Sequence, residues 1–357
     1  MTALPTEHGP LVRELQRRAA VIRQPVNGAF ELTERCNLCC EMCYVCLSAR
    51  DAARRQKELS AAEWLTLAQD AVDNGMVFLL LTGGEVFLRP DFFDIYTPLT
   101  RLGLMLTLFT NGTLVTDRIA QRLAENPPSL TQITLYGGTA ATYEAVTGVP
   151  GSYARCCTGI EALLKHRIRL ELKTTITRRN VGELEAMRQM ANNWGLAFSG
   201  AWMLMRRRDG KPSKVEDCRL SPQDCVSLEA TERLDADERT ESALRGTRAR
   251  NAPVFRCQAG KSAFAINSSG EMSPCLNLSQ PGARPLDTGF RAAWERLQHF
   301  VDGAPPLGSV CLACEMQGYC PLCPAWSAME TGSLTEPVPY LCSIASVRKE
   351  RYEGTPA

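Results

Sequence analysis

The stretch Cys36-Asn-Leu-Cys-Cys40-Glu-Met-Cys43-Tyr decides how this chain is interpreted. Three of its thiols, those of Cys36, Cys40 and Cys43, follow the spacing Cys-x3-Cys-x2-Cys. That spacing can place three thiolates on three irons of a 4Fe–4S cluster and leave the fourth iron open to a small ligand. Cys39 and Cys46 lie in the same run, so other triplets can also be drawn.

Two other uses of these cysteines fit less well. Tetrahedral zinc usually needs a second cysteine pair or histidines close by, and the chain has only His8, His166 and His299, none of them near the stretch. A disulfide framework is typical of small secreted domains rather than of a large, charged chain. The spacing therefore favours an iron–sulfur site.

The composition bounds the class of protein. The chain has 357 residues, of which 45% are apolar, enough for a large core and a smaller second domain. Its 40 basic and 39 acidic residues give a net charge of +1, which argues against nucleic acid as a partner. Sixteen cysteines indicate metal clusters in a compartment where thiols stay reduced. The N-terminus has no secretion signal and no apolar run could span a membrane, so we expect a cytoplasmic protein with no membrane partner.

Apolar runs and helical patterns alternate along the chain, as parallel strands with crossover helices do. Ser60 with Glu63 forms a capping box, and Thr116 precedes another helix start. Six such units predict an α/β fold, a partial (β/α)6 TIM barrel, with the cysteine triplet just after the first strand, where barrel enzymes carry their chemistry. The expected strands are 28–32, 76–81, 104–109, 132–135, 169–176 and 196–204, and the expected helices are 11–22, 61–74, 91–102, 117–125, 153–166 and 181–194.

The chain divides by composition into five segments. The run Arg206–Arg208 is interpreted as a solvated turn. After Phe255, glycine, proline and cysteine crowd together, which is typical of a small iron–sulfur domain held by metal. The expected segments are a lead-in at 1–26, the barrel at 27–215, a helical bridge at 216–250, the cysteine-rich domain at 251–345 and a tail at 346–357.

The cysteine triplet resembles the signature of radical S-adenosylmethionine (radical SAM) enzymes. Met42 fits as the apolar residue before the last ligand, and Cys39 and Cys46 are then spare thiols. The resemblance implies that the amino acid end of SAM fills the open iron. It also implies reductive cleavage of SAM to a 5′-deoxyadenosyl radical.

The segment Gly83-Gly84-Glu85 after the second strand resembles the family motif that binds the methionine amino group. Glycines let a backbone approach a ligand closely, and the carboxylate can receive an ammonium group. Thr110-Asn111 resembles the family's polar turn after the third strand.

Further along, Thr134 matches the position of a hydroxyl that reaches SAM in relatives. Where relatives carry an arginine for the SAM carboxylate or ribose, this chain has Thr147. Lys173 or Arg155 could take over that contact.

Seven cysteines follow in the C-terminal part, four of them as Cys-x2-Cys-x5-Cys-x2-Cys. Alone, that group could be a zinc ribbon. In this order after a radical SAM core, the seven resemble the SPASM extension, which carries two auxiliary 4Fe–4S clusters, giving three clusters in all. The resemblance assigns Cys257, Cys275 and Cys323 to the first auxiliary cluster, and Cys311, Cys314, Cys320 and Cys342 to the second.

Two departures concern the first auxiliary cluster. The last central spacing is x2 where the family commonly has x3, and no second cysteine lies near Cys257. Only three thiolates are therefore identified, and the fourth iron is either open or held by an unidentified residue.

Relatives of this kind mostly modify peptides, which predicts an oxidoreductase of ribosomal-peptide (RiPP) biosynthesis. Leu276, where sulfatase maturases carry a catalytic Asp, disfavours formylglycine formation. Epimerisation would need a hydrogen donor, for which Cys218 is a candidate, although a chance surface cysteine fits equally well. The full cysteine module favours installation of a thioether or carbon–carbon crosslink.

The same resemblance implies partners. The 26 residues before the first strand are too few for a leader-binding domain, so either a separate protein presents the peptide or no such element is needed. A flavodoxin or ferredoxin would supply electrons. A small-molecule enzyme of cofactor or tetrapyrrole maturation is the alternative, and a non-catalytic iron–sulfur scaffold is a third.

Overall fold

The structure is a computed structural model that describes residues 8–45, 47–231 and 253–353. Six parallel strands form its core in the order β1-β4-β5-β6-β7-β8, each paired with the next. The expected partial barrel is thereby confirmed. The strands are β1 (Asn27–Glu31), β4 (Phe78–Thr82), β5 (Met105–Thr110), β6 (Leu130–Thr134), β7 (Leu170–Thr175) and β8 (Phe198–Ala201); a separate pair is β2 (Arg35–Cys36) with β3 (Leu47–Ser48).

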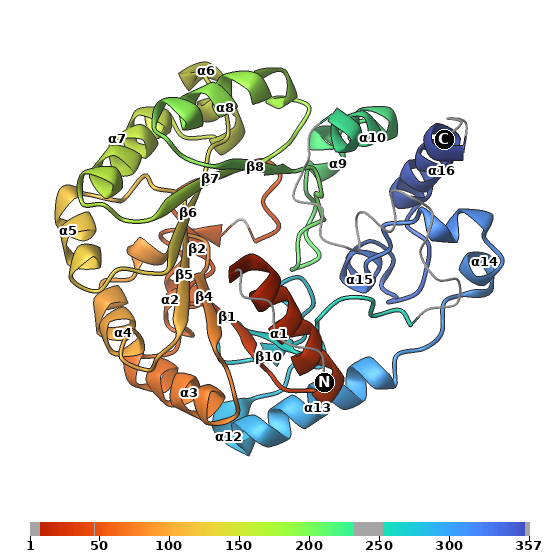
Figure 1. The fold of residues 1–357 in the computed structure, drawn as a ribbon, viewed down its shortest axis with the longest axis horizontal. Coiled ribbons are helices and arrows are strands. Elements are labelled where there is room, and N and C mark those ends of the chain that lie inside the picture. The colour runs from red at the N-terminus through yellow and green to blue at the C-terminus, as the bar shows by residue number, and fades with distance from the viewer. Residues whose placement is uncertain (1–7, 46, 232–252, 354–357) are drawn as a thin grey trace.

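Helices cover the outer face of this curved sheet (Figure 1). The capping box predicted at Ser60 is present, and the Thr116 side chain caps the helix that follows it. The barrel helices are α2 (Ala52–Arg55), α3 (Ala61–Asp73), η1 (Val86–Leu88), α4 (Phe92–Leu99), α5 (Asp117–Glu125), α6 (Ala140–Thr147), α7 (Ser152–Lys165), η2 (Val181–Glu183) and α8 (Leu184–Asn193), and α1 (His8–Ile22) precedes the barrel.

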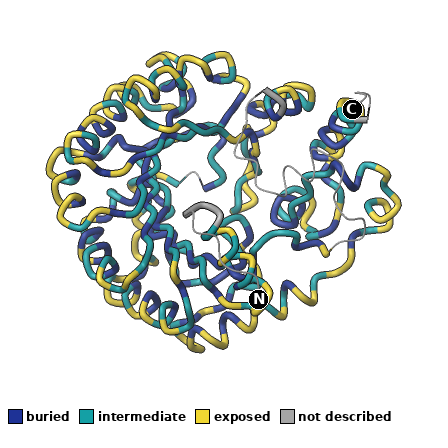
Figure 2. The backbone as a smooth tube through the Cα atoms, in the orientation of Figure 1, coloured by how far each residue is buried: buried dark blue, intermediate teal, exposed yellow. Residues whose placement is uncertain are grey.

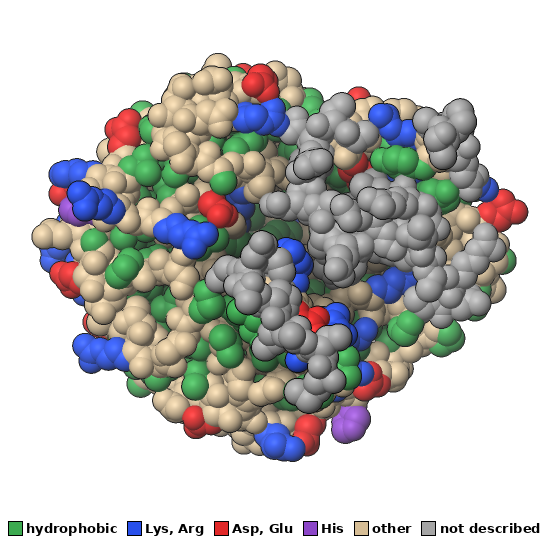
Figure 3. All heavy atoms as spheres, viewed as in Figure 1, with side chains coloured by type: hydrophobic (Ala, Val, Ile, Leu, Met, Phe, Trp, Pro, Cys, Tyr) green, Lys and Arg blue, Asp and Glu red, His purple; other side chains and the backbone are tan. Residues whose placement is uncertain are grey.

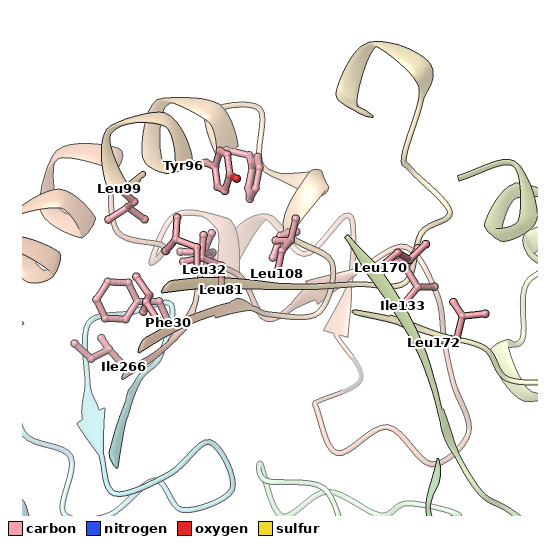
Figure 4. Packing of buried hydrophobic residues seen from close by; sticks show 14 of the residues in the cluster. Phe30, Leu32, Leu81, Tyr96, Leu99, Leu108, Ile133, Leu170, Leu172 and Ile266 are labelled. Carbon is pink, nitrogen blue, oxygen red and sulfur yellow. The ribbon is translucent and has the colours of Figure 1, made fainter. Parts of the chain in front are cut away.

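The main core lies between the sheet and these helices. Figure 4 shows Leu81 and Leu108 on neighbouring strands, facing Tyr96 and Leu99 of α4. In Figure 2 the buried colour follows the sheet while the outer helix faces are exposed. Because alternate strand residues point outward into this core, the remaining strand residues face the interior of the barrel.

The C-terminal part continues the barrel sheet. Strand β9 (Ala263–Ile266) pairs in parallel with β1, and β10 (Met272–Ser273) pairs antiparallel with β9. The remaining helices are α9 (Val215–Cys218), α10 (Pro222–Thr231), α12 (Pro285–Thr288), α13 (Phe290–Asp302), α14 (Ser309–Leu312), η3 (Glu315–Gly318), α15 (Pro324–Thr331) and α16 (Pro339–Glu353). The helices α14 to α16 stand at the open side of the barrel, beyond α10 (Figure 1).

The expected segment boundaries stay predictions. Helix α16 spans the boundary that was expected between residues 345 and 346. The expected bridge at 216–250 begins with α9 and α10, and its part after residue 231 lies outside the described residues.

The surface and the helices bear on partners. No helix in the described ranges is long and apolar enough to cross a bilayer. On the face shown in Figure 3, basic and acidic side chains are interspersed rather than gathered by sign.

Candidate active site

The cysteine triplet lies in the loop that follows β1. Cys36, Cys40 and Cys43 are close enough for their charges to interact, and the Cys43 amide donates to the Cys40 carbonyl at 3.0 Å. Met42 packs beside them in a small apolar cluster with Leu38, Val146, Leu204 and Val215.

Helix α6, which the sequence analysis did not predict, holds this loop in place. The Cys39 amide donates to the Thr147 carbonyl at 2.9 Å, and the Glu41 amide donates to the Val146 carbonyl at 3.2 Å. The Thr147 hydroxyl is fully buried and bonds to Ser152 at 2.8 Å. The residue that replaces the family arginine therefore serves packing here.

The chemistry of the three thiols fits an iron–sulfur cluster. Burial raises the pKa of Cys36 to about 12 and raises that of Cys40 as well, so neither would ionise without a metal, whose coordination deprotonates a thiol. Within the described residues no group of three cysteine, histidine or acidic side chains could hold a single metal ion. Cys39 is exposed, and Cys46 lies outside the described residues.

The glycines of the Gly83-Gly84-Glu85 motif are required by the cysteine loop itself. A Cβ on Gly83 would come within 2.4 Å of the Thr33 carbonyl, and one on Gly84 within 2.3 Å of the Arg35 carbonyl. The Gly84 and Glu85 amides donate to those same two carbonyls at 2.7 and 2.9 Å. The backbone at Gly83 and Gly84 is therefore closely approached, and the group that approaches it is the segment leading into Cys36.

The Glu85 carboxylate is fully buried and already occupied. It accepts from the Thr110 hydroxyl at 2.8 Å, from the Asn111 amide at 2.7 Å and from the Phe87 amide at 3.2 Å. The expected contact of Glu85 with an ammonium group stays a prediction. The bonds within the protein fix the turn after β5, from which Asn111 donates to Asn37 at 2.9 Å and lies 3.6 Å from the Cys36 sulfur.

Thr134 and Lys173 stand opposite each other on β6 and β7 and face the barrel interior. The Lys173 ammonium lies 2.9 Å from the centroid of the Phe109 ring, and no carboxylate of the described residues pairs with it. Burial lowers its pKa to about 7. Arg155, the other candidate, is exposed on α7 and donates to the Pro150 carbonyl, so Lys173 is the better placed cation.

Cys218, the candidate hydrogen donor, is not a surface cysteine. It is 4% exposed at the end of α9 and packs in the same apolar cluster as Cys40 and Met42. Its thiol bonds to Glu41, and burial raises its pKa to about 11. It therefore sits against the backbone of the cysteine loop.

Six of the seven C-terminal cysteines interact within the set assigned to them, and the place of Cys320 in the second set stays a prediction. Cys275 interacts with Cys257 and Cys323, and burial raises the pKa of Cys275 to about 12. Cys342 interacts with Cys311 and Cys314. Helix η3 lies between Cys314 and Cys320, and from it the Gln317 side-chain Nε2 donates to the Cys311 carbonyl at 2.7 Å.

A buried arginine next to these thiols has no partner. All three guanidinium nitrogens of Arg256 are shielded from solvent and make no hydrogen bond, and its charge acts on Cys320. An unpaired buried cation is costly, whereas a cluster with four thiolates is anionic. The orphaned guanidinium therefore fits a second auxiliary cluster at this place.

Arg208 connects the two cysteine regions, and the expectation of a solvated turn is wrong for this residue. Its guanidinium donates to Glu31 and Glu34 at 2.7 Å each and to the Leu276 carbonyl at 2.9 Å. Its backbone amide donates to the Tyr44 carbonyl at 2.9 Å. The local run of arginines does not predict these partners, because they lie far away in the sequence.

An apolar cavity of about 440 Å³ separates the first C-terminal cysteine set from the barrel strands. Cys257, Cys275 and Leu276 line one side, and Ala29, Leu80 and Phe109 line the other. The first set therefore faces the barrel interior.

Comparison with known proteins agrees with this geometry. The radical SAM superfamily profile matches residues 30–190. The AdoMet-dependent heme synthase of Methanosarcina barkeri is 27% identical, over 90% of this chain and 97% of its own length. The antilisterial bacteriocin subtilosin biosynthesis protein AlbA of Bacillus subtilis is 26% identical, over 84% of this chain and 67% of its own. The crystal structure of Streptococcus suis SuiB bound to precursor peptide SuiA superposes with a TM-score of 0.69 at 16% identity, covering 95% of this chain and 82% of that one.

Barrel, cysteine triplet and profile together define a radical SAM enzyme, which uses SAM and a 4Fe–4S cluster. Residues 30–190 form a radical SAM domain, and the cysteine-rich part that follows it in the chain is SPASM-like.

Proposed function

We propose that this enzyme abstracts a hydrogen atom from a peptide and installs a crosslink, either a thioether or a carbon–carbon bond. When bound at Cys36, Cys40 and Cys43, the cluster and SAM supply a 5′-deoxyadenosyl radical. The observation that carries the proposal is the pair of additional cysteine sets, one of which faces the barrel interior across an apolar cavity.

A crosslink removes two hydrogen atoms from the substrate. One is taken by the deoxyadenosyl radical, and the second leaves as a proton and an electron that need an acceptor. Two auxiliary clusters, which would make three in all, provide that acceptor. The set of Cys257, Cys275 and Cys323 offers three thiols, so an open iron there could also bind a substrate thiolate.

Within the barrel we assign SAM to the edge formed by the cysteine loop, the Gly83-Gly84 strand end and the turn at Asn111. Lys173 is the proposed partner of the SAM carboxylate, because it is a buried cation without an anion among the described residues. Thr134, in register with it, would approach the ribose.

Epimerisation with Cys218 as hydrogen donor is a less favourable form of the same proposal. The thiol is 4% exposed and bonds to Glu41, so it would have to leave its apolar cluster to meet a substrate. Substitution of Cys218 with Ala is expected to leave the peptide product unchanged.

Cofactor maturation is the second candidate function. It is favoured by the similarity to the heme synthase of Methanosarcina barkeri over nearly the full length of both chains. An unpaired lysine inside the barrel would equally suit a small carboxylate-bearing substrate.

One experiment separates the two functions. The anaerobically reconstituted enzyme is incubated with SAM, reductant and either a short peptide encoded beside its gene or an iron porphyrin with carboxylate side chains. Peptide modification predicts loss of two mass units from the peptide and none from the porphyrin. An altered porphyrin with an unaltered peptide would instead establish cofactor maturation. A flavodoxin or ferredoxin is the proposed reductant, and a separate leader-binding protein is added in a parallel reaction.

A further inference from the structure

Arg256 is the one buried guanidinium of the described residues whose three nitrogens all lack a hydrogen-bond partner. Other buried arginines are fully engaged: Arg219 pairs with Glu330, and Arg348 pairs with Glu229 at 2.5 Å. Because a guanidinium stays charged in proteins, burying one without a counter-charge is strongly unfavourable. No described residue hydrogen-bonds this guanidinium, so its counter-charge is left for a group outside the described residues to supply.

Arg256 lies near cysteines of both C-terminal sets. The residue precedes Cys257, which belongs to the first C-terminal set, and its charge acts on Cys320, which belongs to the second. Phe255 and Val254 pack in one apolar cluster with cysteines of both sets, including Cys275 and Cys311. The guanidinium is thus held in a low-dielectric region between the two sets.

We propose that Arg256 is a positioning residue that supplies the counter-charge of the second auxiliary cluster and raises its reduction potential. Reduction adds one negative charge to the cluster, so a nearby fixed cation stabilises the reduced form more than the oxidised form. Charge and hydrogen bonding near the sulfurs are established determinants of such potentials. The inference rests on the assignment of a cluster to Cys311, Cys314, Cys320 and Cys342, and it is independent of what the substrate is.

The test is a redox titration followed by electron paramagnetic resonance, made without substrate. The variants are Arg256→Gln, which removes the charge, and Arg256→Lys, which keeps it. Arg284→Gln is the control, because Arg284 lies on the surface of the same region and pairs with Asp287. A Cys311→Ala, Cys342→Ala background, which should not assemble the second cluster, identifies the signal that belongs to it.

The proposal predicts that Arg256→Gln lowers the potential of the second cluster by at least about 59 mV, a tenfold change in a one-electron equilibrium. Arg256→Lys should shift it less, and Arg284→Gln should not shift it. Selective loss of the second cluster in Arg256→Gln, with its retention in Arg256→Lys, supports the same role. Unchanged potentials in Arg256→Gln would overturn the proposal, as would equal cluster loss in the Gln and Lys variants or a wild-type enzyme without the second cluster. Failure of the peptide assay alone would affect only the proposed function.

Discussion

At the scale of single residues, the polar groups of the site hydrogen-bond to one another in the protein alone. Glu85 orders the turn of Thr110 and Asn111, and Asn111 in turn reaches Asn37 and Cys36. The sequence motif predicts SAM binding in this region, and the structure adds contacts within the protein that the motif did not predict. A motif shows which residue types are needed. The packing shows whether those residues contact the ligand or the residues that position it.

Substitution of Gly84 tests how far this packing positions the cysteine loop. In Gly84→Ala the new methyl group would collide with the Arg35 carbonyl, and overpacking of a rigid backbone typically costs about 1–3 kcal/mol. We expect the free energy of unfolding of the apoprotein, measured in urea, to fall by this amount in Gly84→Ala. We also expect reduced iron binding at the first site. Gly182→Ala is the matched control, because no atom lies within 4 Å of its added Cβ, and it should change stability by less than about 0.5 kcal/mol. Equal stabilities of the two variants would contradict the packing argument.

Lys173 gives a prediction about pH. Its pKa in the folded protein is about 7, below the value of about 10.4 in an unfolded chain. Between these values the unfolded state binds more protons, so the free energy of unfolding of the apoprotein should rise as pH increases from about 7 to about 10. Lys173→Met should flatten that rise. Urea unfolding midpoints of both proteins, measured at several pH values across this range, test the prediction.

The same group should affect SAM binding in the opposite direction. A protonated lysine attracts the SAM carboxylate, so affinity should fall as pH rises through about 7, and Lys173→Met should bind weakly at every pH. Isothermal titration of the reconstituted enzyme checks this. An identical pH profile in the variant would remove Lys173 from the SAM site.

At the scale of elements, periodic patterns predicted the strands and most of the barrel helices well. The helices α3 and α5 begin at the residues that their caps predicted. Helix α6 has only eight residues and was missed, although it anchors the cysteine loop. The pairing of β9 with β1 was missed because it joins strands from opposite ends of the chain, and no local pattern records such a partner.

The loop after β8 carries a prediction about Arg208. Arg208→Ala would leave Glu31, which is 1% exposed, buried without its cation, and loss of one partner from a buried pair costs about 3–5 kcal/mol. It would also release the Tyr44 and Leu276 segments from each other. We expect the SAM-dependent change in the resonance spectrum of the first cluster to broaden or disappear.

Arg206→Ala is the control from the same run. Its ion pair with Glu216 is exposed on both sides and should contribute about 0–1 kcal/mol. Arg208→Ala with the stability and spectrum of Arg206→Ala would show that the buried network has no role.

At the scale of the whole molecule, the cysteine-rich part is built into the barrel rather than attached to it. Strand β9 extends the sheet, and a buried ion pair joins α10 to α16. There Glu229 accepts from Arg348 and also from the Trp202 indole at 3.1 Å, just beyond β8. The composition indicated two regions, because it shows where cysteines are concentrated. It does not show which strands pair.

This junction predicts that the two regions unfold together. Glu229→Gln removes the charge that Arg348 needs and should cost about 3–5 kcal/mol in a single transition. Tryptophan fluorescence and loss of cluster absorbance, to which both regions contribute, are recorded on the same urea series. Two transitions at different urea concentrations would contradict a joint core.

The most direct test of the account is the fate of SAM on the reconstituted enzyme. After anaerobic loading with iron and sulfide and reduction with dithionite, the protein should convert SAM to 5′-deoxyadenosine. The variant with Cys36, Cys40 and Cys43 all replaced by Ala should give none while it keeps the auxiliary iron. Intact SAM with the wild-type enzyme, or zinc in place of iron at those three cysteines, would contradict the assignment of the site.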